Sequence, residues 1–138
     1  MQTDDELRAL LAGARRIAVL GAHVDPEKPA HYVPDYLHRT GYRILPVNPV
    51  YAGRLLWGEP VRASLAELSE PVDVLDVFRR SARVADHADE ILALRPDLVW
   101  LQSGIRNDTV ARTLEDAGIP VVQDRCLMVD HRRLGRSP

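Results

Sequence analysis

The chain has 138 residues, 46% of them apolar, and its 18 basic and 20 acidic side chains give a formal net charge of −2. This length and apolar content predict one globular domain, spanning residues 1–138, with a sizeable core. The charge balance lacks the basic excess of a general nucleic-acid-binding protein. We therefore expect no nucleic-acid partner, and an anionic ligand would need positive charge gathered locally.

Cysteine content and the N-terminal sequence bear on the compartment. Cys126 is the only cysteine, which excludes an internal disulfide framework and favours a reducing cytoplasm. The first six residues carry acidic side chains where a signal peptide would carry basic ones, and no apolar run approaches the roughly 18 residues of a membrane span. The sequence therefore predicts a cytoplasmic protein with no membrane partner.

Strand-like and helix-like patterns alternate along the chain. The segment Thr3–Glu6 has capping-box spacing and precedes leucines that share one helical face. Pro34 is tolerated only in the first turn of a helix, so the helix after the first strand should start close to it, at Ala30 or Val33. The predicted elements are a helix from about 3 to 13, a strand over 16–20, a helix from 30 or 33 to 40, a strand over 43–47, one helical turn at 64–67, a strand over 72–78, a helix from about 84 that stops before 96, a strand over 98–101, a helix through 110–117, a short strand over 120–123 and a helix or turn over 127–134.

This alternation predicts a three-layer, doubly wound (Rossmann-like) α/β domain with a five-stranded parallel sheet. Strands 16–20 and 98–101 are the most uniformly apolar and should lie centrally, whereas Asp73 and Asp76 favour an edge position for strand 72–78. The strand order 3-2-1-4-5 satisfies both conditions. Ligands of such sheets bind where the order reverses, here between the first and fourth strands.

The loop after the first strand argues against a dinucleotide site. A G-x-G-x-x-G fingerprint would need two more glycines after Gly21, and none occurs before Gly41. In NAD enzymes of this fold, an acidic residue near the end of the second strand grips the ribose. Asn48 and Pro49 stand there instead, which counts against NAD.

Ordered sequence blocks run through nearly the whole chain, at residues 17–22, 28–33, 36–37, 41–43, 46–49, 72–79, 100–105 and 124–126. Together they resemble the small standalone bacterial coenzyme A-binding proteins, which are similar in turn to the N-terminal CoA-binding domain of the succinyl-CoA synthetase alpha subunit. The synthetase works through a phosphorylated histidine in a second domain, and this sequence ends before such a domain, so we expect no ligase activity.

The resemblance implies a coenzyme A site in the predicted crevice. The first loop and the end of the second strand would hold the phosphate and adenine end, and the ends of the third and fourth strands would form two walls. The residues implied are Gly21, Ala22, His23, Lys28, Pro29, Asn48, Pro49, Val77, Phe78, Arg79, Gln102, Ser103, Gly104 and Ile105. Loop cations at the same sheet edge agree with a phosphorylated ligand; these are Lys28, Arg79, Arg80 and Arg106.

We therefore expect a protein that binds coenzyme A or an acyl-CoA and acts as a carrier, sensor or accessory subunit without catalysis of its own. One alternative is an NAD(P)-linked or acyl-transfer enzyme that uses His23 or Cys126, and another is a regulatory domain with a vestigial pocket. The candidate metal ligands His23, Asp25, His31 and His38 follow no recognised metal-ligand spacing, so no metal is expected. A homodimer is the default expectation for assembly.

Overall fold

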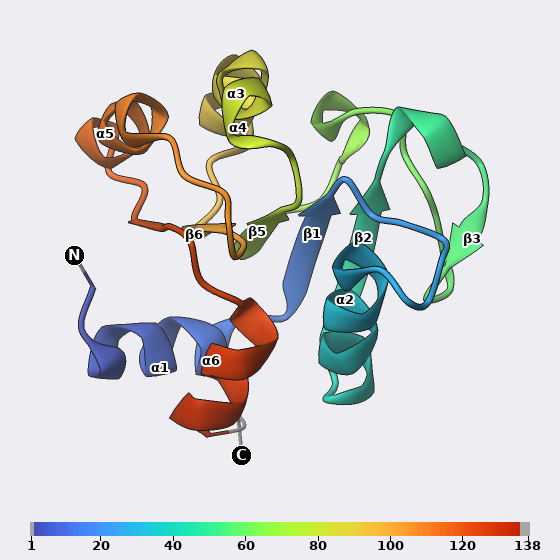
Figure 1. The fold of residues 1–138 in the computed structure, drawn as a ribbon, viewed down its shortest axis with the longest axis horizontal. Coiled ribbons are helices and arrows are strands. Elements are labelled where there is room, and N and C mark those ends of the chain that lie inside the picture. Colours follow the sequence, from blue (N-terminus) through green and yellow to red (C-terminus); the bar gives the residue numbers. More distant parts are fainter. Residues whose placement is uncertain (1, 136–138) are drawn as a thin grey trace.

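Five parallel strands form the central sheet of the computed structural model, which describes residues 2–135 (Figure 1). The strands are β1 (Arg16–Leu20), β2 (Arg43–Val47), β5 (Val74–Val77), β6 (Leu98–Leu101) and β7 (Val121–Val122). Helices cover both faces of this sheet. The doubly wound, Rossmann-like α/β fold predicted from the sequence is confirmed.

The position of the third strand of this sheet differs from the prediction. The observed order is β2-β1-β5-β6-β7, which is 2-1-3-4-5 among the five parallel strands rather than 3-2-1-4-5. Asp73 precedes β5, and its Oδ2 accepts the backbone N–H groups of Arg15 and Arg16 at 2.8 and 2.9 Å. Asp76 is fully buried. The two acidic residues therefore do not mark an edge strand, and the order reverses between β1 and β5.

Two layers of helices bury the two faces of the sheet (Figure 1). Helices α1 (Asp4–Gly13), α2 (Pro29–Arg39) and α6 (Leu127–Leu134) pack on the face that carries Ile17, Val19 and Trp100. The opposite face, with Leu75 and Val77, is covered by α3 (Ser81–Val84), η3 (Ala85–His87), α4 (Ala88–Leu94) and α5 (Asp108–Asp116). None of the helices within residues 2–135 is long and apolar enough to cross a membrane.

Helix α2 starts earlier than the sequence predicts. It begins at Pro29, with Lys28 as its N-cap, so Pro34 lies inside the helix rather than in its first turn. Pro34 has no backbone N–H to donate to the carbonyl of Ala30, one turn earlier. That carbonyl instead accepts the backbone N–H of His23 at 3.2 Å. The start of α2 is therefore tied to the loop that follows β1.

The connection between β2 and β5 contains a small hairpin where the sequence predicts only loop and one helical turn. Its elements are η1 (Pro49–Tyr51), β3 (Leu55–Leu56), β4 (Glu59–Pro60) and η2 (Leu65–Glu67). The hairpin turn places both Trp57 (φ 53°) and Gly58 (φ 76°) in the left-handed region. The indole N–H of Trp57 donates to Asp35 Oδ1 of α2 at 3.1 Å, which anchors the hairpin to the domain.

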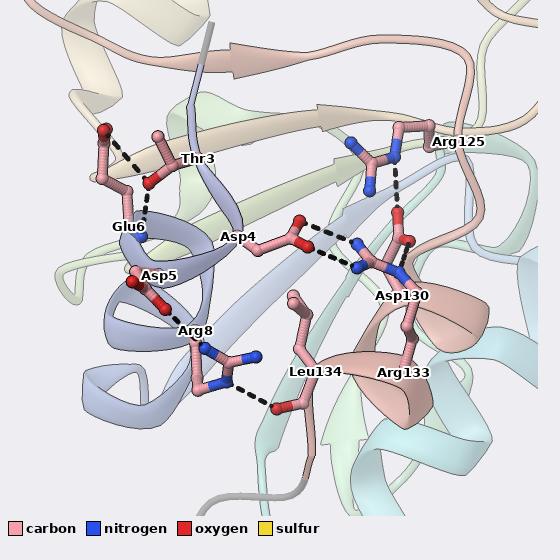
Figure 2. Close-up of polar contacts among 9 residues, drawn as sticks. All are labelled: Thr3, Asp4, Asp5, Glu6, Arg8, Arg125, Asp130, Arg133 and Leu134. Carbon is pink, nitrogen blue, oxygen red and sulfur yellow. Dashed lines mark hydrogen bonds and ion pairs between the residues drawn. The ribbon is translucent and has the colours of Figure 1, made fainter.

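An ion-pair network joins the first and last helices (Figure 2). Arg133 of α6 donates twice to the carboxylate of Asp4 on α1, at 2.7 and 3.1 Å. The hydrogen bond from Arg133 is the main reason that the pKa of Asp4 is lowered. Buried Asp130 accepts from Arg125 at 2.7 Å and from Arg133 at 3.2 Å. This network fixes the segment that leads from β7 into α6.

Candidate ligand-binding site

A cavity of about 720 Å³ opens at the carboxyl ends of the strands, where the strand order reverses. Sheets of this kind bind their ligands in the crevice at this point. The walls come from the loops after β1, β5 and β6 and from the first turns of α2 and α6. Val33, Phe78, Ile105 and Met128 contribute apolar surface.

Gly21 allows the loops after β1 and β5 to approach each other closely. Its φ of 93° lies in the left-handed region, and a Cβ at this position would be 2.7 Å from the carbonyl oxygen of Phe78. The Gly21 N–H donates to the carbonyl of Val47 at the end of β2, at 2.8 Å. Three strand ends thus converge on one residue, and only glycine fits there.

Asn48 and His23 fix the first loop. Asn48 Nδ2 donates to the carbonyl of Ala22 at 2.9 Å, which joins the ends of β2 and β1. His23 Nδ1 accepts the backbone N–H of Asp25 at 3.0 Å, and its Nε2 lies 3.2 Å from the hydroxyl of Tyr51. Both ring nitrogens are therefore used within the protein. Over residues 2–135, His, Cys, Asp and Glu side chains form no cluster that could hold a metal.

Ser81 and Asp124 hold the loop after β6 in place. Ser81 Oγ accepts the backbone N–H of Arg106 at 2.9 Å. Asp124 Oδ1 accepts the backbone N–H of Gly104 at 2.6 Å, and Gly104 has a φ of 81° that favours glycine. The segment 102–105 is thereby fixed as one wall of the cavity.

Cations without carboxylate partners stand at the cavity. Lys28 and Arg80 are exposed, and Arg79 is half-buried with its Nε donating to His87 Nε2 at 3.2 Å. Among the residues that the structure describes, none of these three cations forms an ion pair. The cavity therefore keeps positive charge available for an anion despite the net charge of −2.

A smaller cavity of about 250 Å³ adjoins the larger one and shares Gly21 and Arg79 with it. Asn48 and Pro49 line it from the end of β2, and Leu65 lines it from η2. The two cavities are therefore neighbours along the carboxyl ends of the strands.

A buried polar pair lies at the floor of the larger cavity. Gln102, which is 4% exposed, lines the cavity, and its Nε2 donates to Asp76 Oδ1 at 2.5 Å. Desolvation raises the pKa of Asp76 to about 8, and the hydrogen bond from Gln102 opposes that rise only in part. The carboxyl is therefore mostly protonated at neutral pH.

Most of the residues implied by the resemblance are brought together. The larger cavity is lined by Gly21, His23, Lys28, Pro29, Phe78, Arg79, Gln102, Ser103, Gly104 and Ile105. Asn48 and Pro49 line the smaller cavity. Ala22 and Val77 are completely buried and line neither. Arg106, expected at the same mouth, pairs with Asp108 at 3.1 Å and lines neither cavity.

Several lining residues were missed by the sequence analysis. Tyr32 and Val33 belong to the first turns of α2, which was predicted to start too late. Cys126, Met128 and Val129 come from the segment after β7. A signal for this segment existed, because the carboxyl end of every parallel strand meets the same edge of the sheet.

A depression of about 660 Å³ at the amino ends of β1 and β2 is the main competing site for an anionic ligand. Arg15, Arg16 and Arg43 line it. Glu70 pairs with both Arg16 and Arg43, and Glu59 pairs with Arg43 at 2.9 Å. Because these pairs neutralise most of the local positive charge, this depression is a weaker anion site than the crevice.

The fold and the crevice define a class: a doubly wound α/β domain with an unneutralised cationic mouth at the reversal of its strand order. Such a mouth suits a phosphorylated ligand. The sequence profile of the CoA binding domain family matches residues 15–132. The chain belongs to that family, and the resemblance seen in the sequence is confirmed.

The chain is also similar to a curated protein and to a solved structure over nearly its whole length. The uncharacterized protein YneT of Bacillus subtilis is 34% identical over 126 residues, which cover 91% of this chain and 92% of YneT. The solved structure of cell-free ID.343 from Thermus thermophilus is 61% identical, with a TM-score of 0.96 and coverage of 97% of this chain and 100% of that one.

A more distant solved structure shares the fold. It is the dinucleotide forming acetyl-coenzyme A synthetase 1 of Ca. Korarchaeum cryptofilum, with 22% identity and a TM-score of 0.70. The match covers 87% of this chain but only 27% of the synthetase chain. At this identity the similarity shows the fold alone.

Proposed function

We propose that this protein binds coenzyme A or an acyl-CoA in the crevice between the ends of β1 and β5. The observation that carries the proposal is the combination of an unneutralised cationic mouth with an extensive, partly apolar cavity. Coenzyme A has the matching chemistry, since one end is a phosphorylated nucleotide and the other is a long neutral arm. Membership of the CoA binding domain family supports this ligand.

The two ends of the ligand have different expected positions. The phosphates would lie near Lys28, Arg79 and Gly21, where free cations and the N-terminal end of α2 favour negative charge. The adenine would lie towards Asn48 and Pro49 in the smaller cavity. The neutral arm would then run along Phe78 and the 102–105 wall of the larger cavity.

With coenzyme A or an acyl-CoA bound, the protein would act as a carrier, a sensor or an accessory subunit, and this chain alone would catalyse no reaction. The arrangement of His23 supports it, because both ring nitrogens are engaged within the first loop. A homodimer and a cytoplasmic location stay predictions from the sequence.

Ligand specificity tests the proposal directly. Thermal unfolding is measured with coenzyme A, acetyl-CoA, NAD, NADPH and ATP at matched concentrations. A ligand present at about a hundred times its Kd should stabilise the protein by about 2.7 kcal/mol. Stabilisation by coenzyme A is the expected result. A shift with NADPH and none with coenzyme A would overturn the proposal.

Charge reversal locates the site. Lys28→Glu and Arg79→Glu should each weaken coenzyme A binding by about tenfold or more, because a charge-assisted contact becomes a repulsion. Arg112→Glu is the matched control, since Arg112 is exposed on α5 and lines neither cavity. Equal affinity in all three variants would instead favour a regulatory domain with a vestigial pocket.

Acyl transfer is a second candidate because Cys126 lines the same cavity. The thiolate form of Cys126 could attack the carbonyl carbon of an acyl-CoA thioester, which breaks the bond to the coenzyme A sulfur, releases coenzyme A as its thiolate and leaves the acyl group on the cysteine. Thioester turnover that disappears in Cys126→Ser would support this activity. Turnover unchanged by the substitution, or absent from the unsubstituted protein, would remove Cys126 from consideration.

A further inference from the structure

An acidic residue lies in the core where an aliphatic one would be expected. Asp76 is completely buried, and the strand register places it between Val19 of β1 and Trp100 of β6. Along β5 it shares a face with Val74, which packs in the core under α1, α2 and α6. No cation pairs with Asp76 among residues 2–135, and its Oδ2 has no hydrogen-bond partner there.

Gln102 connects this acid to the cavity. It lies two residues beyond Trp100, so both side chains emerge on the same face of the sheet. Nε2 of Gln102 donates to Asp76 Oδ1, as described above. Oε1 of Gln102 accepts no hydrogen bond from the described residues, yet it is not among their fully buried unpartnered atoms. The oxygen is therefore left as an accessible acceptor in a side chain that lines the cavity.

The cost of this arrangement points to a use for it. A buried polar atom without a partner lowers stability, whereas a leucine at the same position would pack against Val19 and Trp100 and leave no carboxyl oxygen unpaired. Departures from simple core packing are concentrated at functional sites. Only Gln102, at the cavity floor, makes a hydrogen bond to the Asp76 side chain within the described chain.

We propose that Asp76 is a positioning residue for ligand recognition: it holds the Gln102 carboxamide so that Oε1 accepts a hydrogen bond from an amide N–H of the ligand's neutral arm. This inference rests on the proposed function, because the arm of coenzyme A carries two amides. Asp76 itself does not touch the ligand. Its protonated carboxyl resembles a carboxamide in shape and charge, so asparagine can replace it.

Two ligands separate recognition of the arm from recognition of the nucleotide. Coenzyme A carries the arm, whereas adenosine 3′,5′-bisphosphate carries the nucleotide and two of its three phosphates without it. Asp76→Leu should weaken coenzyme A binding by about tenfold, the equivalent of one hydrogen bond, and leave bisphosphate affinity within about twofold. Asp76→Asn should retain coenzyme A affinity within about threefold, because the amide oxygen still accepts from Gln102.

Stability measurements distinguish this role from a merely structural one. Asp76→Leu removes the unpartnered carboxyl oxygen but also leaves Gln102 Nε2 without its acceptor, so its stability should stay close to that of the unsubstituted protein while it binds coenzyme A less tightly. Asp73→Ala is the matched control on the same segment. It removes the acceptor for the N–H groups of Arg15 and Arg16, so it should lower stability without changing the ratio of the two affinities.

Each outcome decides one question. Failure of the unsubstituted protein to bind coenzyme A would end the proposed function. Binding of coenzyme A together with an equal loss for both ligands in Asp76→Leu, or with no loss, would overturn only the inference about Asp76. If Asp76→Leu does not fold, Gln102→Leu decides instead, and it should show the same loss restricted to coenzyme A.

Discussion

At Gly21 the backbone leaves no room for a side chain. Its φ of 93° is unfavourable for any residue with a Cβ, and a Cβ there would lie only 2.7 Å from the carbonyl oxygen of Phe78. Gly21→Ala should therefore lower the free energy of unfolding by at least about 2 kcal/mol, because it combines left-handed strain with a backbone clash. Urea denaturation of the purified variant measures the loss.

Gly41 is the matched control, because it has a left-handed backbone conformation but no atom close to the position of a Cβ. Its φ is 113°, but no atom lies within 4 Å of a Cβ built there. Gly41→Ala should cost about 1 kcal/mol, from backbone conformation alone. Equal losses at the two positions would show that the clash with Phe78 relaxes freely and that Gly21 is not needed for close approach of the two loops.

Protonation of Asp76 gives stability a pH dependence. Burial raises the pKa of Asp76 from its usual 3.8 to about 8. Between these values the folded state holds a proton that the unfolded chain has released, so the free energy of unfolding falls as pH rises. The contribution has a slope of at most about 1.4 kcal/mol per pH unit and flattens above the folded-state value.

Asp76→Asn removes this contribution because an amide does not titrate. The stability of the Asn variant relative to the unsubstituted protein should therefore grow from pH 5 to pH 8. Urea denaturation at several pH values across that window measures the difference, in which contributions common to both proteins cancel. A constant difference would mean that Asp76 ionises alike in the folded and unfolded states.

The positions of some residues could be predicted from the sequence, and those of others could not. Gly21 and Gln102 were identifiable because each follows an apolar strand and belongs to a block shared with a known family. Asp76 was misread because periodicity treats an acidic residue as a sign of exposure. Its burial depends on contacts with β1, β6 and Gln102 that no local pattern encodes.

At the scale of elements, Asp130 determines how α6 is docked. Its buried carboxylate bridges Arg125, which precedes the helix, and Arg133 near its end (Figure 2). Asp130→Ala should destabilise the protein by about 1–3 kcal/mol, because a buried, doubly bonded acceptor is lost. It should also weaken coenzyme A binding, since Cys126 and Met128 of the adjacent segment line the cavity.

Asp4 is the control for Asp130 because it binds the same arginine at the surface. Exposed ion pairs contribute little to stability because solvent screens them, so Asp4→Ala should change stability little and coenzyme A affinity not at all. Thermal denaturation and calorimetric titration of both variants provide the comparison. Similar effects at the two positions would assign the docking of α6 to apolar packing instead.

The regular elements were predictable, whereas two local exceptions were not. Apolar runs and capping signals located the five parallel strands and most of the helices. The start of α2 was placed too late because Pro34 was judged by its missing N–H alone. The structure gives the freed Ala30 carbonyl a donor in His23. The β3–β4 hairpin was missed because Trp57, a non-glycine residue, occupies a left-handed turn position.

For the whole molecule, the sequence indicated the class of fold but not the strand order. The sequence of each strand predicts which of its residues are buried. The strand order depends instead on which strands pair with one another, and these are far apart in the sequence. Asp73 and Asp76 favoured an edge position for the third parallel strand. In the structure, Asp73 accepts backbone N–H groups just before that strand begins, and Asp76 accepts a hydrogen bond from Gln102 in the core. The crevice was still placed at the correct edge of the sheet, because the carboxyl ends of all five parallel strands meet there in either order.

The distribution of charge over the whole molecule should make coenzyme A affinity depend on salt. The net charge of −2 mildly repels a polyanionic ligand, so attraction must come from the local cations Lys28, Arg79 and Arg80. Salt screens exposed charges, so coenzyme A affinity should fall steadily between roughly 0.05 and 0.5 M NaCl. Neutral variants Lys28→Gln and Arg80→Gln should flatten this dependence and weaken binding at low salt about three- to tenfold.

Arg112→Gln tests whether position rather than total charge matters. It makes the same change in net charge on α5, outside both cavities. Calorimetric titrations at each salt concentration should give this variant the affinity and salt slope of the unsubstituted protein. If Arg112→Gln reduced the slope as much as Lys28→Gln, the long-range field would carry the attraction. The unneutralised cations at the crevice would then lose their proposed role, because any surface arginine would serve equally well.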